Sequence, residues 1–232
     1  MKTLAVVSRK GGAGKTTVAV NLLLAARLRG VKAVLADADP LRSASEVLAQ
    51  RKDAAKLLLP TSPTKLYPLQ QACRRSGVEL LIIDTPAAPE NDVMEAVKLA
   101  DLCLAVSRPT YLDLAAAVRS MSIVRHFQRQ GMVVLNQCAP PRLGVEPPAV
   151  QKAFEALGIA KLEVAPVALR QRMAYQNAFS MRRAVTEADA GDVASQEVLA
   201  LFKRVWKFMR EQDAAITAAN DRGHAGYGHA FA

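Results

Sequence analysis

Cysteine is scarce in this sequence, and its positions lack the spacing of a metal site or a disulfide framework. Cys73, Cys103 and Cys138 are scattered along 232 residues, and no two of them form a CxxC pair. This usage is typical of a reducing compartment, so we expect a cytoplasmic protein. It also disfavours an iron–sulfur carrier, which would need cysteines at ligand spacing.

Long hydrophobic runs are also missing. The longest apolar segments, such as "VAVNLLLAA" and "LLII", are far shorter than the roughly 20 residues of a transmembrane helix. The first residues enter the apolar segment "TLAVVS" directly, without the pattern of a secretory signal. We therefore expect neither a membrane span nor a signal peptide. A hydrophobic content of 51% with 22% charged residues is typical of a globular protein.

Acidic residues are absent from two long stretches. None occurs between Asp113 and Glu146, and none between Arg170 and Arg183, although each stretch holds four arginines (Arg119, Arg125, Arg129, Arg142; Arg170, Arg172, Arg182, Arg183). The whole chain carries a formal charge of +10 and a pI near 9.8. Such a balance indicates a polyanionic partner, either nucleic acid or an anionic membrane, although a basic protein can also be merely soluble.

Short β-rich segments alternate with longer segments of helical periodicity. The expected strands are "TLAVVS", "KAVLAD", "LLIID", "LCLAVS", "MVVLNQ" and "LEVAPV". The pattern predicts an α/β fold, a doubly wound and mostly parallel sheet with helices on both faces. We expect one domain over residues 1–212 and a flexible tail over 213–232, where the sequence becomes rich in Gly and His.

A glycine-rich loop, "SRKGGAGKTT" at residues 8–17, follows the first expected strand. Glycines let backbone N–H groups turn toward a phosphate, and the N-terminus of the next helix adds its positive dipole. Lys15 can then reach the β- and γ-phosphates, and Thr16 can place its hydroxyl on Mg²⁺. The loop residues expected to hold the nucleotide are Lys10, Gly11, Gly12, Ala13, Gly14, Lys15, Thr16 and Thr17.

The segment "RKGGAGKT" resembles the deviant Walker A motif, xKGGxxK[ST], of the ParA/MinD ATPases. Residues 3 to about 210 resemble this family, and the chain looks most like its short ParA-type partition and cargo-positioning proteins. The resemblance implies a P-loop fold and a homodimer that forms with ATP. It also implies a role for Lys10. In this family the first lysine of the motif, which Lys10 matches, reaches the nucleotide held by the partner subunit.

Acidic residues end two expected strands. Asp39 follows the second one in "VLADADP", where a carboxylate can orient the attacking water or a metal-bound water; Asp37, Asp39 and Pro40 match the family's DxDP motif. Leu41 departs from the family's Gln. Asp84 closes "ELLIIDTP", which matches a Walker B pattern that holds Mg²⁺ through a coordinated water. An aspartate in such a place can also be only a helix cap.

Further matches to the family are weaker. Asn136 resembles the residue that reads the adenine ring, although an Asn after a strand is equally typical of a turn. Backbone from Pro166 onward is expected to border the adenine. Asp113 and Leu114 match an Asp-Leu pair that shapes the dimer and the nucleotide pocket.

These residues predict hydrolysis of ATP by positioning and charge, without a covalent nucleophile. The resemblance implies a switch that binds non-specific DNA as a dimer, is stimulated by a ParB-like or adaptor protein, and partitions or positions a plasmid, chromosome region or protein cargo on the nucleoid. Phosphate contacts require positive charge. The candidate DNA-binding residues are Arg170, Arg172, Arg182, Arg183, Lys203, Arg204 and Lys207.

Two alternatives remain at this stage. A MinD-like protein would bind a membrane through an amphipathic helix, and "EVLALFKRVWKFMREQ" (197–212) has apolar residues on one side and basic residues on the other. The same pattern is typical of a helix packed on its own sheet. A metabolic enzyme of the dethiobiotin synthetase type shares the fold and a P-loop, but it requires neither Lys10 nor strong positive charge.

Overall fold

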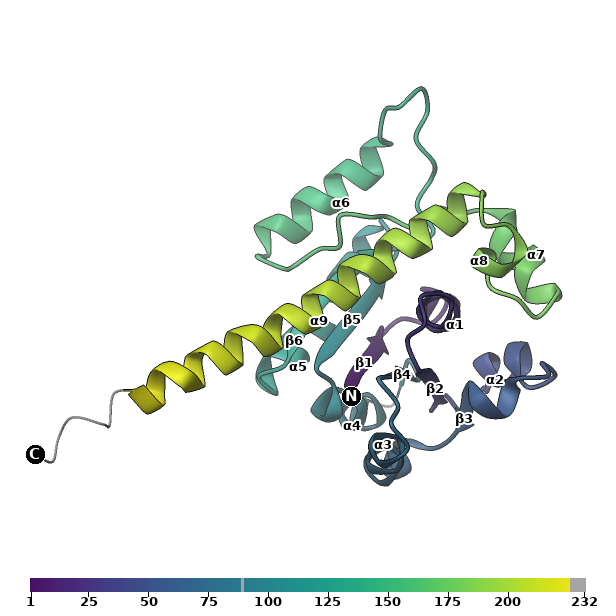
Figure 1. The fold of residues 1–232 in the computed structure, drawn as a ribbon. Helices are drawn as coiled ribbons and strands as arrows, with labels where there is room; N and C mark the ends of the chain where they lie inside the picture. The colour runs from purple at the N-terminus through teal and green to yellow at the C-terminus, as the bar shows by residue number, and fades with distance from the viewer. Residues whose placement is uncertain (89, 226–232) are drawn as a thin grey trace, which may run out of the picture.

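The computed structural model describes residues 1–88 and 90–225, with side chains described as far as Glu211, and a parallel β-sheet forms its centre (Figure 1). The sheet has six strands in the order β3-β2-β4-β1-β5-β6, and all paired strands are parallel. The strands are β1 (Lys2–Val7), β2 (Ala33–Asp37), β3 (Leu58–Pro60), β4 (Leu80–Asp84), β5 (Leu102–Ser107) and β6 (Gln130–Leu135). The predicted α/β class is confirmed.

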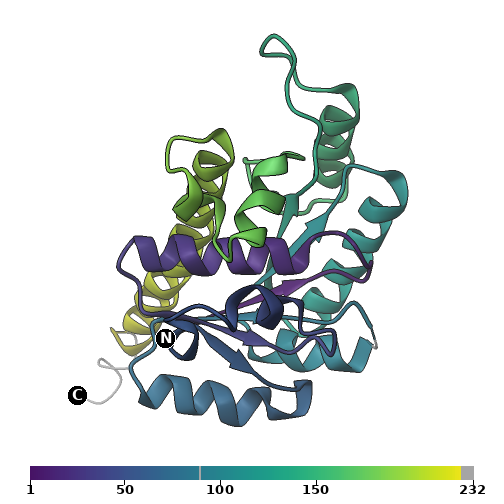
Figure 2. The ribbon, with the colours of Figure 1, turned by 90° about the vertical axis from the view of Figure 1, so that its right-hand side faces the viewer.

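Helices cover both faces of the sheet (Figure 2). Successive residues of a strand point to opposite faces, so Leu4 and Val6 of β1 belong to one buried cluster, and Ala5 and Val7 to the other. The first face carries α1 (Lys15–Leu28), α2 (Ser43–Leu48), α7 (Met173–Ser180), α8 (Val185–Ala188) and α9 (Val193–Ala225). The second carries α3 (Leu66–Arg75), α4 (Glu90–Leu99), α5 (Tyr111–His126) and α6 (Pro148–Ile159).

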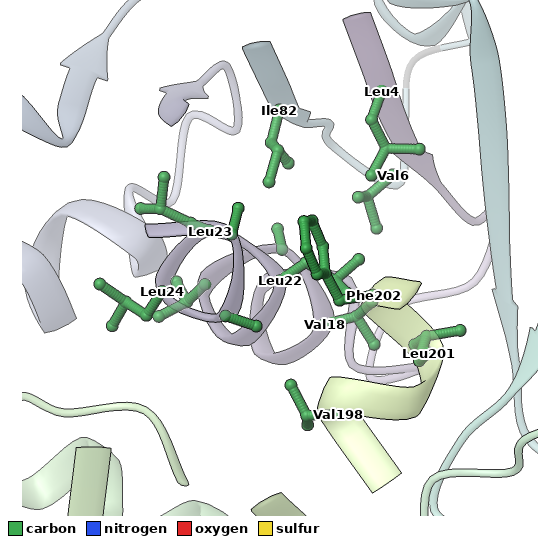
Figure 3. Packing of buried hydrophobic residues seen from close by; sticks show 14 of the residues in the cluster. Leu4, Val6, Val18, Leu22, Leu23, Leu24, Ile82, Val198, Leu201 and Phe202 are labelled. Carbon is green, nitrogen blue, oxygen red and sulfur yellow. The ribbon is translucent and has the colours of Figure 1, made fainter. Parts of the chain in front are cut away.

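Helix α1 is buried between the sheet and α9. Figure 3 shows Leu22 of α1 and Phe202 of α9 on the side of the sheet that carries Leu4 and Ile82. The glycine-rich loop ends where α1 starts. The burial of α1 therefore holds the end of the loop in a fixed position. Two short 3₁₀ turns, Ala54–Lys56 and Pro63–Lys65, flank β3.

Two strand predictions differ from the structure. The segment "LEVAPV" forms only an isolated parallel bridge between Val164 and Val133. The N–H of Ala165 donates to the carbonyl of Val133, but Leu169 and not Val167 donates to the carbonyl of Leu135, so the chain leaves the register of a parallel strand after Ala165. Strand β3, Leu58–Pro60, was not expected. It has three residues and pairs with β2 alone, so it is too short to give a period-two pattern.

Part of the segment expected to be a tail is helical. Helix α9 continues past residue 212 to Ala225 and extends beyond the sheet in Figure 1. Its sequence there, "DAAITAANDR", is rich in alanine, the residue with the highest helix propensity. Residues 226–232 of the predicted tail lie outside the described residues. No helix in the described part of the chain has both the length and the apolar character to cross a bilayer.

Candidate nucleotide and metal site

The glycine-rich loop joins β1 to α1 and requires glycine at its last position. Gly14 is the N-cap of α1 and has a φ of 92°, a left-handed conformation. A Cβ at this position would lie 2.2 Å from Nδ2 of Asn136, so no side chain fits. Glycines of the loop and the first residues of α1 line the same groove, which is the arrangement of a phosphate site at a helix N-terminus.

The residues after β6 hold the loop in place. Nδ2 of Asn136 donates a hydrogen bond of 2.8 Å to the carbonyl of Ala13, and Nε2 of Gln137 donates one of 2.8 Å to the carbonyl of Gly12. Asn136 is buried. The role of Asn136 in the structure is thus to position the loop, and adenine recognition by this residue stays a prediction. Gln137 was not identified from the sequence, since a Gln after a strand carries no signal of its own.

An open groove of about 470 Å³ lies beside the loop, at the carboxyl ends of β1, β2 and β4. It brings together three segments that are distant in the sequence, and its lining residues are Gly11, Gly12, Gly14, Lys15, Thr16, Asp39, Pro40, Leu41, Ser43, Pro86, Ala87 and Ala88. Asn136 and the exposed Pro166 are not among them. The sequence prediction that strand ends form the site is consistent with this arrangement.

Lys15 and Thr16 meet Asp84 at the floor of the groove. The hydroxyl of Thr16 donates a 2.7 Å hydrogen bond to Oδ2 of Asp84, whose Oδ1 is buried without a partner. Burial raises the pKa of Asp84 to about 7, the Thr16 hydrogen bond opposes this, and the charge of Asp37 adds to it. Burial also lowers the pKa of Lys15, against the attraction of Asp84 and Asp39.

A second buried carboxylate lies next to Asp84. Asp37 ends β2 in register with Asp84 at the end of β4. Its Oδ2 accepts hydrogen bonds from the backbone N–H and the hydroxyl of Ser45, at 2.9 and 2.6 Å, and its Oδ1 has no partner in the described structure. Two adjacent buried carboxylates, each with one oxygen that lacks a hydrogen bond, reduce the stability of the fold unless a cation neutralises their charge.

Asp39 lies at the edge of the groove. It is partly exposed, and its Oδ1 accepts a 2.9 Å hydrogen bond from the N–H of Leu41. This turn leaves Leu41 82% exposed. The structure thus places this carboxylate at the rim of the groove, and its role in orienting a water molecule stays a prediction.

These residues fit a magnesium-bound nucleoside triphosphate. The open glycine loop and Lys15 suit phosphate oxygens, and the unpartnered Oδ1 of Asp84 with the hydroxyl of Thr16 suits a hard cation directly or through water. Thr16 and Asp84 would hold Mg²⁺, which supplies neutralisation of charge on the phosphates when bound.

Lys10, the other lysine of the loop, is not among the residues that line the groove. Nζ of Lys10 lies 3.5 Å from Oδ2 of Asp113, near the start of α5, and the Nε of Arg108 lies 3.1 Å from Oδ1 of the same carboxylate. Burial alone would raise the pKa of Asp113, but hydrogen bonds from Thr110 and Arg108 and the charge of Lys10 lower it. Within its own subunit, Lys10 is therefore not part of the phosphate groove.

The structure corrects one candidate DNA contact and weakens another. Arg170 is 8% exposed, and its guanidinium is bonded to both carboxylate oxygens of Glu146 and to the carbonyl of Ala139. A buried, paired guanidinium cannot reach a phosphate, so the prediction for Arg170 is wrong. The guanidinium of Arg172 is 25% exposed and lies 2.7 Å from Glu197.

The remaining candidates form two surface groups. Arg182 and Arg183 are exposed on the turn between α7 and α8. This turn is held by Arg51, which donates to the carbonyl of Arg182 at 2.8 Å. On α9, Lys203 and Lys207 are exposed, whereas Arg204 is partly buried and paired with Glu163.

One apolar side of α9 is buried in the fold and is not available to a membrane. Val198, Leu201, Phe202, Val205 and Met209 on this side belong to the same buried cluster as α1. The alternative that this amphipathic pattern packs on its own sheet is confirmed for the described side chains.

A parallel sheet with a phosphate loop after β1 and aspartates at the ends of β2 and β4 defines a P-loop nucleotide-binding protein. Residues 4–214 match the family described as the CobQ/CobB/MinD/ParA nucleotide binding domain, and the chain belongs to this family. It is an ATPase of the ParA/MinD type.

Individual relatives agree with this assignment. The chain is 34% identical over 167 residues to the maintenance of carboxysome distribution protein A of Gloeobacter kilaueensis, covering 70% of this chain and 74% of that protein. It is 25% identical over 226 residues to protein ParA of Rhizobium radiobacter, covering 90% and 100%. The MinD cell division protein of Aquifex aeolicus has the same fold, with a TM-score of 0.74, 21% identity and coverage of 89% and 98%.

Proposed function

We propose that this ATPase is a dimerising switch that binds non-specific DNA in its ATP state and positions a cargo. The observation that carries the proposal is that the two lysines of the loop lie in different places. Lys15 is buried in the phosphate groove, whereas Lys10 lies outside it on Asp113. We infer that Lys10 acts on the nucleotide of a second subunit, because it contacts Asp113 and does not line the groove of its own subunit.

The surface around Lys10 suits such a dimer. Leu41 at the rim of the groove is 82% exposed, and Tyr111 and Leu112, just before Asp113, are 83% and 62% exposed. Large apolar side chains that lie in water are stabilised when a partner covers them. We infer that two copies meet with their nucleotide grooves facing each other.

The proposed chemistry uses positioning and charge. Lys15 binds the β- and γ-phosphates, Asp84 and Thr16 hold the cation, and Asp39 orients the attacking water. Lys10 of the opposite subunit adds positive charge to the transferred phosphoryl group, as an arginine finger does. Hydrolysis is slow until a ParB-like or adaptor protein stimulates it.

The DNA surface of the proposed switch is centred on the turn between α7 and α8. Arg182 and Arg183 are exposed there and have no carboxylate partner among the side chains that the structure describes. Lys203 and Lys207 of α9 are also exposed, but they are not part of this proposed surface. Contacts of this kind read phosphate charge and not base sequence, which would place the protein on the nucleoid.

Two proteins similar to this chain support a positioning role. One is a carboxysome distribution protein and the other is a ParA. The cargo of this chain is proposed only as a class: a plasmid, a chromosome region or a protein assembly that carries the stimulating partner.

The proposal is tested by measuring binding to non-specific duplex DNA and to anionic vesicles, each with ATP, with ADP and without nucleotide, at two salt concentrations. We expect DNA binding only with ATP, with a steep fall at high salt as counterions compete. Binding to vesicles and not to DNA would favour the MinD-like membrane alternative. Binding to neither, with ATP turnover intact, would favour a metabolic ATPase.

A matched pair of variants locates the surface. Arg182→Ala with Arg183→Ala should weaken DNA binding in the ATP state and leave dimerisation intact. Arg74→Ala with Arg75→Ala removes another adjacent and exposed arginine pair, at the end of α3, and should have little effect. Equal losses in the two double variants would show that net charge alone, and not the α7–α8 turn, governs binding.

A further inference from the structure

A groove of about 690 Å³ lies between α9 and the turn that follows α1, and the proposed ATPase cycle makes no use of it. Its apolar lining consists of Val31, Leu199, Phe202 and Trp206. The rings of Phe202 and Trp206 are stacked, with centroids 6.1 Å apart. The volume is in the range of sites that accept ligand or peptide side chains.

Basic side chains surround this apolar lining. The groove is lined by four cationic residues, Arg29, Lys203, Lys207 and Arg210, and by one carboxylate, Glu211. Glu211 is already 3.5 Å from Lys207, and no described carboxylate lies within ion-pair distance of the other three. Arg204, on the same helix but outside the groove, is paired with Glu163. Among the described side chains, the groove therefore carries an excess of positive charge.

The spacing of residues along α9 builds the groove. Residues 199, 202, 203, 206, 207 and 210 recur at intervals of three and four, so they share one side of the helix. The neighbouring side carries the buried residues Val198, Leu201, Val205 and Met209. Leu199 and Trp206 lie next to this buried side and are only partly buried, so packing against α1 leaves them accessible in the groove.

We propose that this groove binds an acidic amphipathic helix of a partner protein. The apolar side of such a helix would cover Leu199 and Trp206, and its carboxylates would pair with the surrounding lysines and arginines. Duplex DNA matches the charge but offers no apolar surface for the groove. A bilayer matches both properties but is too flat to enter a concave site.

The groove is separate from the nucleotide site. Lys15 begins α1 at the phosphate loop, and Arg29 follows its last residue, so the length of the 14-residue helix, about 20 Å, lies between the two sites. A partner helix could therefore bind while the nucleotide face is covered by a second subunit. The proposal does not depend on the proposed DNA switch.

The sequence provides its own probe, because Trp206 is the only tryptophan of the chain. The test titrates the full-length protein with three synthetic helical peptides that share an apolar side of Leu and Phe and carry Glu, Ser or Lys on the polar side. We expect a blue shift of Trp206 fluorescence, with affinity in the order Glu, then Ser, then Lys. Binding of a dye-labelled Glu peptide is followed in parallel by anisotropy.

Charge reversal supplies the control. Lys203→Glu with Lys207→Glu should weaken binding of the Glu peptide at least tenfold, whereas Lys152→Glu with Lys161→Glu, at exposed positions in and after α6, should not. Three results would each overturn the proposal: no shift with the Glu peptide up to its solubility limit, equal affinity for all three peptides, or equal binding by both charge-reversed variants. A blue shift with duplex DNA or anionic vesicles, together with displacement of the peptide, would also contradict it.

Discussion

Nζ of Lys10 lies 3.5 Å from Oδ2 of Asp113, and this contact holds the loop lysine on its own subunit. In the proposed switch, Lys10 must leave Asp113 to reach the partner's nucleotide. The ion pair therefore competes with the dimer.

Asp113→Asn should strengthen the ATP-dependent dimer. The side chain of Lys10 is 36% exposed, so each pair is worth roughly 0.5–1 kcal/mol. Because a dimer must break one such pair in each subunit, their loss should tighten dimerisation about five- to thirtyfold. Sedimentation velocity with ATP measures the monomer–dimer constant. Glu95→Gln, which removes an exposed carboxylate paired with Lys98, is the control and should leave the constant unchanged. An unchanged or weaker dimer in Asp113→Asn would show that the contact does not compete.

Asp39→Ala should bind ATP and dimerise but fail to hydrolyse it. The carboxylate lies at the rim of the groove and contacts only the N–H of Leu41 among described groups, so its removal should leave the loop intact. We expect a fall in turnover of about 100-fold or more, the usual effect of losing a group that positions or activates water. Phosphate release measures turnover, and undiminished turnover would remove Asp39 from the mechanism.

Without nucleotide and cation, the protein should lose stability as the pH rises from about 4 to about 7. The folded-state pKa of Asp84 is about 7, against an ordinary value of 3.8. Between these values the folded state keeps a proton that the unfolded state has lost, so the free energy of unfolding falls, by an amount on the order of a few kcal/mol. Above about 7 this contribution is constant.

Asp84→Asn isolates this effect, because the amide oxygen can still accept from Thr16 while the charge is gone. Urea unfolding at several pH values should show a weaker decrease in this variant than in the wild type. The variant should also lose the added stability that Mg²⁺ gives to the nucleotide complex. A variant with the wild-type pH profile would show that Asp84 is not the group responsible.

Arg170→Met should destabilise the fold without a specific loss of DNA affinity. The change removes the bonds to Glu146 and to the carbonyl of Ala139, at a cost of about 1–3 kcal/mol because Glu146 stays partly in water. Arg183→Ala should show the opposite pattern, a wild-type free energy of unfolding and weaker DNA binding. Urea unfolding and a DNA titration of both variants separate the two roles.

Much of the fold and the phosphate site could be predicted from the sequence. Buried parallel strands are continuous apolar runs, and the glycine loop, Asp39 and Asp84 stand directly at their ends, so local signals sufficed. The strand β3 was not predicted, because its three residues are too few to show an alternating pattern. It is recognised as a strand only from its pairing with β2. The predicted strand around Val164 is reduced to one bridge because the chain leaves the register of β6 after Ala165, which the apolar pattern does not reveal.

Contacts between distant segments could not be predicted in the same way. Asn136 and Gln137 hold the loop through hydrogen bonds that span 123 and 125 residues. Arg170 looked like a free surface charge because Glu146, its partner, lies 24 residues away along the chain. The sequence shows how many charges there are, but only packing decides which of them are already paired.

The most direct test of the proposed switch is the mass of the protein in solution with ATP, measured by light scattering in the Asp39→Ala background so that ATP persists. We predict a dimer with ATP and a monomer with ADP, and a monomer in both cases when Lys10→Ala is added, although that variant still binds ATP. Lys15→Gln, which should not bind ATP at all, is the control. A normal ATP-dependent dimer in the Lys10→Ala variant would contradict the account.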